Sequence, residues 1–367
     1  MSVRVALIGN AFASRVQLPA LRAVGGVDVV GIAGAQLAKA QRTAQEWEIG
    51  LATDRWQDLL ALEPDLVLVS SPAHLHEPMV LELCAQSGAA ILCEKPMAVS
   101  EEEAERMTNA AEGRLALIDH QLRFSPPRQA LRRLLADGAI GELWHGSNEA
   151  LFDTPDYASL PFSWWFDVTR GGGAFNALGS HFVDLSEREF GETLAIHARL
   201  QSFIHQRPDE HGELEDVTAE DYAVATLRST TQAITEIRVS RGYAGGRGLR
   251  TSYLGSEGTI TLDNEERLVL HRHGREPELI DAHLPTAAEL GMPPLGPFAR
   301  ALPLYLKQVV AAVRDGRTEL EDAATFAEGL RTQRILDAAH GSHFMGFSVG
   351  VFHEHIEEPY DPENPVL

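Results

Sequence analysis

Short apolar runs alternate with amphipathic helical patterns through the first third of the chain. The predicted strands cover residues 3–8, 27–33, 66–70, 89–93 and 115–119, and the predicted helices cover residues 18–24, 37–48, 56–62, 79–86 and 100–112. Runs that are apolar throughout are typical of strands covered on both faces. Strand and helix alternation at this spacing indicates βαβ units built around a parallel sheet.

The hydrophobic pattern changes near residue 120. Pro126-Pro127 begins a predicted helix that ends near residue 138, and the last two predicted helices cover residues 298–315 and 323–339. Strands are predicted between them at residues 195–204, 221–228, 233–240, 250–254, 259–262 and 267–271, with a hairpin turn at Asp263-Asn264. Alternation of apolar and polar positions favours a largely antiparallel sheet with one face covered.

We therefore predict an α/β protein with two domains, which a length of 367 residues also favours. Residues 1–121 are expected to form a domain around a parallel sheet. Residues 122–353 are expected to form an α+β domain with a large, mostly antiparallel open sheet. The segment 354–367 is rich in proline and carboxylates, so we expect an extended or disordered tail.

Composition narrows the classes of partner. The chain has 31 Lys and Arg against 53 Asp and Glu, a formal net charge of −22, which argues against a nucleic acid or a membrane surface as partner. Cys84 and Cys93 fall in a predicted helix and a predicted buried strand, so we expect neither a disulfide nor a cysteine metal site, and a cytoplasmic location fits. The amino-terminal apolar stretch is too short for a signal peptide, and no run is long enough to span a membrane.

The turn after the first strand resembles a degraded dinucleotide fingerprint. The pattern G-x-G-x-x-G/A lets the backbone approach a pyrophosphate, but here Gly9 is kept while Ala11 and Ser14 replace the other two positions. Its position between a strand and a helix still favours a cofactor turn, with the methyl group of Ala11 displacing or weakening the cofactor. The expected contacts from this turn are Gly9, Asn10, Ala11, Phe12 and Ala13.

Two further loops extend the predicted cofactor site. An acidic residue at the end of the second strand would select NAD, but Gly34 stands there, and Lys39 on the next helix could reach a 2′-phosphate. Both NAD and NADP are therefore allowed. After the 66–70 strand, Ser71, Pro72 and His76 are expected to line the crevice; the alternative is an ordinary loop with helix-capping groups.

A lysine at the carboxyl end of a buried strand is the first candidate catalytic residue. In open α/β sheets ligands bind outside the carboxyl ends of the strands, and Glu94-Lys95-Pro96 stands at such an end. Pro96 biases Lys95 away from helical geometry, so the ammonium is held on a stiff turn. Lys95 could donate a hydrogen bond to a substrate hydroxyl, or it could form a strand-end ion pair.

The segment after Gly171-Gly172-Gly173 is the second candidate. It is predicted to be a helix with Asn176, Ser180 and Asp184 four residues apart on one face. His181 follows Ser180, and the unperturbed pKa of histidine, about 6.5, suits proton transfer near neutrality. A lone helix histidine is usually structural, but its place after three glycines in a chain with a nucleotide-binding first half favours catalysis.

These motifs together resemble the glucose–fructose oxidoreductase / inositol dehydrogenase (Gfo/Idh/MocA) family over nearly the whole chain. The matching segments are 5–14, Ser71-Pro72 with His76, Glu94-Lys95-Pro96, Trp164-Trp165, 171–184 and 324–337. The resemblance implies an amino-terminal Rossmann domain, and hydride transfer between NAD(P) and a sugar or polyol hydroxyl. It also implies a homodimer or homotetramer through the open sheet.

The resemblance assigns roles to individual residues. Lys95 would hydrogen-bond the reacting oxygen, Glu94 and Pro96 would orient it, and His181 would be the proton acceptor or its relay. Glu94 and Lys95 are also expected to contact the cofactor. Lys95, Arg123, Asn176 and His181 form the expected substrate-binding set. An interdomain ion pair is the alternative for Arg123.

One departure from the family pattern affects catalysis. The family often carries an aspartate four residues before the histidine, where this chain has Ala177, and loss of a carboxylate lowers the basicity of His181. Either Lys95 and His181 suffice, or the chemistry differs, or catalysis is lost. The alternatives to a dehydrogenase are a dinucleotide-binding regulator and a lyase or hydrolase that uses bound NAD transiently.

Two remaining groups of residues are ambiguous. His340 with His343, and His353 with His355, have no accompanying ligand set, so no metal site is expected. Trp164 and Trp165 could stack on a sugar, but anchoring of their loop is the favoured interpretation.

Overall fold

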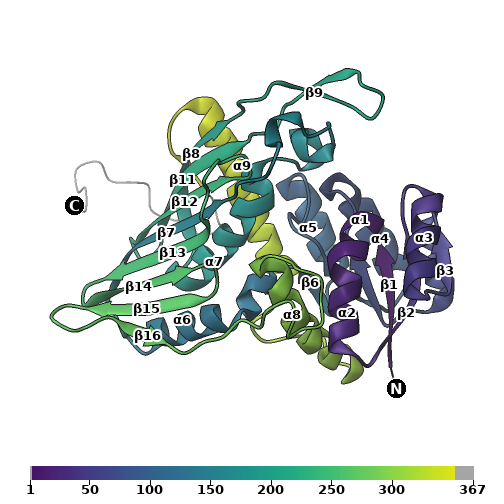
Figure 1. Ribbon diagram of the computed structural model, residues 1–367, viewed down its shortest axis with the longest axis horizontal. Helices are drawn as coiled ribbons and strands as arrows, with labels where there is room; N and C mark the ends of the chain where they lie inside the picture. The colour runs from purple at the N-terminus through teal and green to yellow at the C-terminus, as the bar shows by residue number, and fades with distance from the viewer. Residues whose placement is uncertain (1, 352–367) are drawn as a thin grey trace.

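A computed structural model describes residues 2–351 and divides them between two large sheets (Figure 1). The sheet near the amino terminus has seven strands, and the second has nine. This arrangement confirms the predicted fold class, a parallel-sheet domain followed by a domain with a mostly antiparallel sheet. The predicted tail at residues 354–367, and the histidines His353 and His355, lie outside the described residues.

The first sheet has the strand order β17-β6-β5-β4-β1-β2-β3, and only β17 runs antiparallel to its neighbour. Its strands are β1 (Val3–Ile8), β2 (Val27–Ala33), β3 (Leu51–Thr53), β4 (Leu66–Val69), β5 (Ala90–Cys93), β6 (Ala116–Ile118) and β17 (Ala324–Thr325). Its helices are α1 (Asn10–Phe12), the π-helix η1 (Ala13–Gln17), α2 (Leu18–Val24), α3 (Leu37–Trp47), the 3₁₀ turns η2 (Trp56–Leu62) and η3 (Ala73–Leu75), α4 (His76–Gln86) and α5 (Glu101–Ala110).

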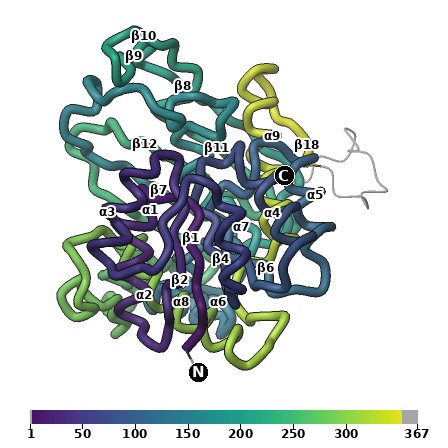
Figure 2. Tube along the Cα trace, turned by 90° about the vertical axis from the view of Figure 1, so that its right-hand side faces the viewer, coloured from purple at the N-terminus to yellow at the C-terminus, as the bar shows by residue number. Residues whose placement is uncertain are grey.

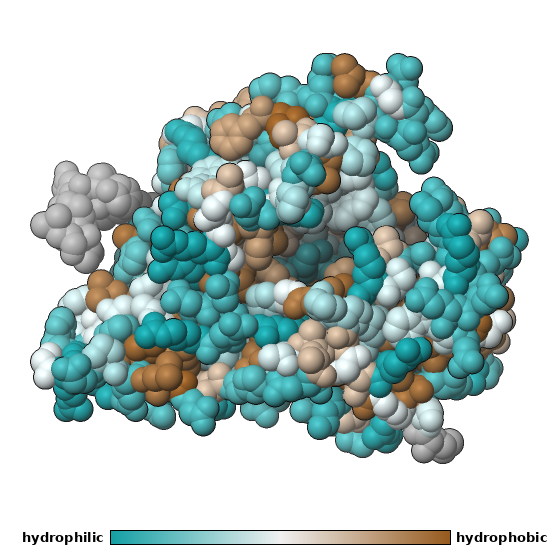
Figure 3. Space-filling model, in the orientation of Figure 1, coloured by the Kyte–Doolittle hydropathy of each residue, from teal (hydrophilic) through white to brown (hydrophobic). Residues whose placement is uncertain are grey.

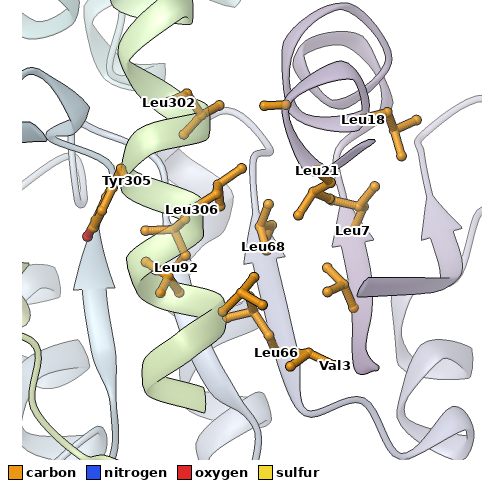
Figure 4. Close-up of a cluster of buried hydrophobic side chains, with 14 of the residues drawn as sticks. Val3, Leu7, Leu18, Leu21, Leu66, Leu68, Leu92, Leu302, Tyr305 and Leu306 are labelled. Atoms are coloured by element: carbon orange, nitrogen blue, oxygen red, sulfur yellow. The ribbon is translucent and has the colours of Figure 1, made fainter. Parts of the chain in front are cut away.

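Helix α8 (Pro297–Arg314) covers one face of this first sheet, although its residues come late in the chain. Figure 4 shows Leu306 of α8 pointing toward Leu68 and Leu92 of the strands. The predicted boundary at residue 121 therefore does not divide the packing, because α8 and β17 both return to the first sheet. Burial of these apolar side chains, at about 25 cal/mol per Å², favours the return.

The second sheet has the strand order β16-β15-β14-β13-β7-β12-β11-β8-β18. Its strands are β7 (Leu143–Leu151), β8 (Thr193–Gln201), β11 (Tyr222–Ser229), β12 (Ile234–Ser240), β13 (Gly248–Gly255), β14 (Gly258–Asp263), β15 (Arg267–Arg272), β16 (Glu278–Ile280) and β18 (Val349–Gly350). All pairs are antiparallel except β7 with β12. Helices α6 (Pro126–Ala136), α7 (Ser180–Phe190) and α9 (Phe326–Met345) cover one face.

Strand β7 lies in the middle of this sheet, yet its sequence carries little strand pattern. Its inward-facing residues are Gly146, Asn148 and Ala150, and Asn148 accepts a hydrogen bond from the hydroxyl of Thr251 at 2.8 Å. A ring carbon of Phe190 fills the space where a Cβ of Gly146 would stand. Because the inward residues of β7 are small or polar, the strand lacks the alternation of apolar and polar residues that identifies the other strands.

The remaining elements are η4 (Gln121–Phe124), which leads from the first sheet to the second, and segments between strands of the second sheet. These segments are η5 (Tyr157–Ser159), η6 (Trp164–Phe166), η7 (Val168–Arg170), the π-helix η8 (Phe175–Gly179), and a hairpin of β9 (Gln206–Pro208) and β10 (Leu214–Asp216). This hairpin projects at the top of Figure 2. Within residues 2–351, no helix is long and apolar enough to cross a membrane.

Candidate functional site

A crevice of about 700 Å³ opens at the carboxyl ends of β1, β2 and β4. Figure 3 shows the molecule hollowed between its two halves on this side. Residues from both halves line the crevice, including Ser163, Trp164, Trp165 and Arg241 from the second half. The predicted cofactor residues that line it are Gly9, Asn10, Ala11, Phe12, Gly34, Ser71 and Pro72.

The one glycine kept from the fingerprint is the one that the backbone requires. Gly9 has φ of 110°, and a Cβ there would lie 2.4 Å from the carbonyl oxygen of Ser70. Asn10 packs against Gly34, where a Cβ would meet the Asn10 side chain at 2.8 Å. No acidic side chain fits at Gly34, and the buried Oδ1 of Asn10 has no hydrogen-bond partner within residues 2–351.

Two predicted cofactor residues stand behind the crevice wall. Ala13 is buried in the apolar core of the first sheet. The ring of His76 is buried between the carbonyl oxygens of Ser71 and Met97, at 2.7 and 3.1 Å, and burial lowers its pKa. His76 therefore holds the Ser71 loop in place instead of lining the crevice.

Lys95 stands two residues after the end of β5 and within electrostatic reach of two buried carboxyl groups. The Lys95–Pro96 peptide is cis. Burial raises the pKa of Glu94 while the Lys95 ammonium lowers it, and burial with the neighbouring Glu94 raises the pKa of Asp119 well above its usual range. Neither Glu94 nor Lys95, both predicted to contact the cofactor, is among the residues that line the crevice.

His181 lies within electrostatic reach of Lys95, so the structure brings the two predicted catalytic residues together. Burial lowers the pKa of His181 well below 6.5, and Lys95, His120 and Arg128 lower it further. No carboxylate opposes these effects, which agrees with the presence of Ala177 in place of an aspartate. The imidazole is therefore neutral at neutral pH, and its buried Nδ1 has no partner within residues 2–351.

A second buried histidine, which the sequence did not single out, stands beside His181. The rings of His120 and His181 meet edge to face with centroids 5.4 Å apart, and the ring of Phe298 lies 4.6 Å from that of His181. His120 Nε2 is 3.9 Å from a carboxylate oxygen of Asp184. Burial lowers the pKa of His120 to about 4 although Asp184 raises it.

Arg123 is committed to a buried ion pair, so its predicted contact with substrate is corrected. Its guanidinium donates to both oxygens of Asp184 at 2.8 and 2.6 Å, and to Glu328 at 2.9 Å. Arg123 and Asp184 are both buried, and Arg123 lowers the pKa of Asp184 against the effect of burial. Arg123 is therefore in an ion pair, as the alternative expected, but the pair lies within the predicted second domain, residues 122–353, and does not join the two domains.

Asn176 is also occupied within the protein. Its amide donates to the carbonyl oxygen of Gly172 at 2.9 Å, and its Oδ1 faces His340 Nε2 at 3.3 Å. A π-helix over Phe175–Gly179 precedes α7 where one regular helix was predicted, and Asn176, Ser180 and Asp184 are all buried. Asn176 contacts His340 of α9, and Asp184 pairs with Arg123.

The three glycines join the tryptophan segment to the catalytic helix. A Cβ on Gly172 would lie 2.4 Å from the carbonyl oxygen of Trp165, and the Gly173 amide donates to that oxygen at 2.9 Å. Trp164 and Trp165 line the crevice, half-buried. Within residues 2–351, no cluster of three His, Cys, Asp or Glu side chains could hold a metal ion.

Comparison with known proteins places this geometry in a family. Residues 3–118 match the model of an oxidoreductase family with an NAD-binding Rossmann fold, and residues 128–261 match the model of the GFO/IDH/MocA C-terminal domain. An uncharacterized oxidoreductase of Synechocystis sp. is 30% identical over 269 residues, 72% of each chain. D-apiose dehydrogenase of Paraburkholderia graminis is 29% identical over 281 residues, 72% of this chain and 69% of its own.

Solved structures show the same fold. Levoglucosan dehydrogenase, in complex with NADH and L-sorbose, aligns with a TM-score of 0.84 at 21% identity, over 95% of this chain and 99% of its own. The degraded fingerprint, the lysine after β5 and the histidine of α7 occur here in the order that the resemblance implied. The chain belongs to the Gfo/Idh/MocA family of oxidoreductases.

Proposed function

We propose that this protein is an NAD(P)-dependent dehydrogenase that oxidises a hydroxyl of a sugar-like or polyol substrate, or reduces the corresponding carbonyl. One observation carries the proposal: Lys95, at the sheet edge where the crevice opens, lies within electrostatic reach of the neutral His181. The names of two relatives, D-apiose dehydrogenase and levoglucosan dehydrogenase, support a sugar-like substrate.

The crevice fits a dinucleotide by its own geometry. Gly9 brings the backbone against β4 where any side chain would clash, and the buried Oδ1 of Asn10 has an unused acceptor site. The residues that would hold the cofactor are Gly9, Asn10, Ala11, Phe12, Gly34, Ser71 and Pro72. When bound, the nicotinamide accepts or donates the hydride.

The chain's own residues supply the proton chemistry. Lys95 donates a hydrogen bond to the substrate oxygen and stabilises the negative charge that develops as the hydroxyl proton leaves. His181 accepts that proton, since its imidazole is neutral, and returns it in the reduction direction. His120, placed against His181 and Asp184, orients the imidazole. Arg123 holds Asp184 from behind.

Cofactor binding and turnover test this proposal. We expect NADH to bind at micromolar to millimolar concentration by nicotinamide fluorescence, and at least one sugar or polyol to be oxidised with net formation of reduced nicotinamide. Absence of NADH and NADPH binding at millimolar concentration would exclude the dehydrogenase. Turnover of substrate without net reduction of nicotinamide would instead indicate a lyase or hydrolase that uses bound NAD transiently.

The second candidate function is a dinucleotide-binding regulator, which the absence of a carboxylate beside His181 favours.

Restoring the carboxylate by Ala177→Asp should raise the pKa of His181, because an opposite charge favours imidazolium. The acid limb of kcat/KM for oxidation should therefore move to higher pH. In the wild type we expect no loss of kcat/KM as pH falls through 6.5, the ordinary histidine pKa. Ala177→Asn, which adds an amide without charge, is the control, and an equal shift in both variants would contradict the account.

The choice of nicotinamide cofactor is part of the proposal. Lys39 and Asp54 both line the crevice near the end of β2, where the adenosine ribose would lie, and Gly34 places no carboxylate there. We expect NAD(H) and NADP(H) to bind within about ten-fold of each other, because one cation and one carboxylate oppose each other there. In Lys39→Glu, NADPH affinity should fall more than NADH affinity, measured by fluorescence titration; an equal fall would contradict a role for Lys39 at the 2′-position.

Assembly through the open sheet and a cytoplasmic location complete the proposal. Val224, Ile234 and Leu254 are exposed on strands of the second sheet whose other face is covered by helices. Such a face fits a homodimer or homotetramer, which sedimentation analysis of the wild type would reveal. Both cysteines are free, as in a reducing compartment.

A further inference from the structure

Two arginines from opposite halves of the molecule face each other across the crevice. Arg15 belongs to η1 of the first half, and Arg241 follows β12 of the second. Both line the crevice beside the turn of Gly9. Within residues 2–351 neither makes an ion pair with a carboxylate, in a chain whose formal charge is −22.

Each arginine is held by contacts of its own half. The Nε of Arg15 donates to the carbonyl oxygen of Ala11 at 3.1 Å, on the turn that follows β1. The guanidinium of Arg241 lies over the ring of Trp165, 4.6 Å from its centroid. Gly173 binds the carbonyl of Trp165 in turn, so Arg241 is joined to the segment that leads to His181.

The positive charges of Arg15 and Arg241 repel each other. Burial and the positive charge of Arg15 lower the pKa of Arg241, while Tyr157 raises it. Two cations without counter-charges, one of them half-buried, are stabilised by a ligand with two negative charges placed between them. A diphosphate has this charge. In a Rossmann fold the diphosphate binds at the turn after the first strand, and Arg15 is hydrogen-bonded to that turn.

We propose that Arg15 and Arg241 clamp the diphosphate of the dinucleotide from the two halves of the molecule. The clamp rests on the proposed cofactor binding, and it supplies charge where the fingerprint has lost two of its glycines. A 2′-phosphate would instead lie toward Gly34 and Lys39, at the end of β2. Because Arg241 is joined to the His181 segment, closing of the clamp also couples cofactor binding to the position of the catalytic histidine.

The test compares ligands that differ in phosphate. NADH, ADP-ribose and adenosine are titrated calorimetrically against the wild type, Arg15→Gln, Arg241→Gln and the exposed control Arg247→Gln, with thermal melts to verify folding. We expect each clamp variant to weaken NADH and ADP-ribose about ten-fold or more, as for a lost charged hydrogen bond. Adenosine binding should stay within about two-fold, and the control should behave as the wild type.

The possible results distinguish failure of the clamp proposal from failure of the dehydrogenase proposal. Unchanged NADH and ADP-ribose affinity in both clamp variants would overturn the clamp, and so would an equal loss of adenosine affinity. A wild type that binds ADP-ribose through both arginines but oxidises no sugar would keep the clamp and contradict the dehydrogenase. A wild type that binds neither NADH nor ADP-ribose would overturn both.

Discussion

Replacing Lys95 by methionine is expected to lower kcat/KM for substrate oxidation by about 1,000-fold, the largest effect of any single change that we anticipate. Methionine keeps the length of the side chain but removes the hydrogen bond to the reacting oxygen and the positive charge beside it. Steady-state kinetics with the identified sugar or polyol would measure the loss. NADH binding should remain within about three-fold of the wild type, because Lys95 does not line the crevice.

The exposed Lys307 of α8 gives the matched control. Lys307→Met makes the same substitution at the surface, so the kinetics of this variant should equal those of the wild type. If the Lys95→Met variant retains more than about a tenth of wild-type kcat/KM, Lys95 has no essential role in the reaction. Parallel loss of NADH binding would instead point to a disrupted fold.

Arg123→Met is expected to reduce the free energy of unfolding by about 3–5 kcal/mol, because it leaves the buried carboxylate of Asp184 without its partner. Urea unfolding followed by tryptophan fluorescence would measure the change. Arg132→Met is the control: Arg132 pairs with Asp322, but its side chain is 50% exposed, so the loss should be under about 1 kcal/mol. If both variants unfold at the same urea concentration, Arg123 is not the central member of this ion-pair network.

Much of the first domain could be predicted because its strands are buried on both faces. Such strands read as apolar runs, and parallel strands end at one edge of the sheet, so Gly9 and Lys95 could be assigned to a common edge. The Rossmann fold and the open antiparallel sheet were both confirmed. The return of α8 to the first sheet was missed, because an amphipathic pattern reports that a helix has an apolar face but not which sheet that face covers.

The site was less predictable where it depends on contacts between distant segments. His120 and Arg241 are single residues in unremarkable stretches, and only tertiary packing places them against His181 and Trp165. His76 matched a motif, yet its ring nitrogens are taken up by backbone carbonyls. The segment after the three glycines begins as a π-helix and not as the regular helix that was predicted, because a π-helix leaves no simple sign in the sequence. A tripled glycine was informative, because close backbone packing excludes side chains at Gly172.

The central claim is that Lys95 and His181 carry out hydride-coupled proton transfer without the usual carboxylate neighbour. A single-turnover experiment tests it most directly: enzyme saturated with NAD is mixed with the substrate, and reduced nicotinamide is followed in the wild type, Lys95→Met and His181→Gln. The account predicts about one equivalent of NADH per site in the wild type. It predicts rates of about 1% or less in both variants, with cofactor binding intact. A wild type that binds NAD but forms no NADH with any sugar or polyol, or variants that react at the wild-type rate, would contradict it.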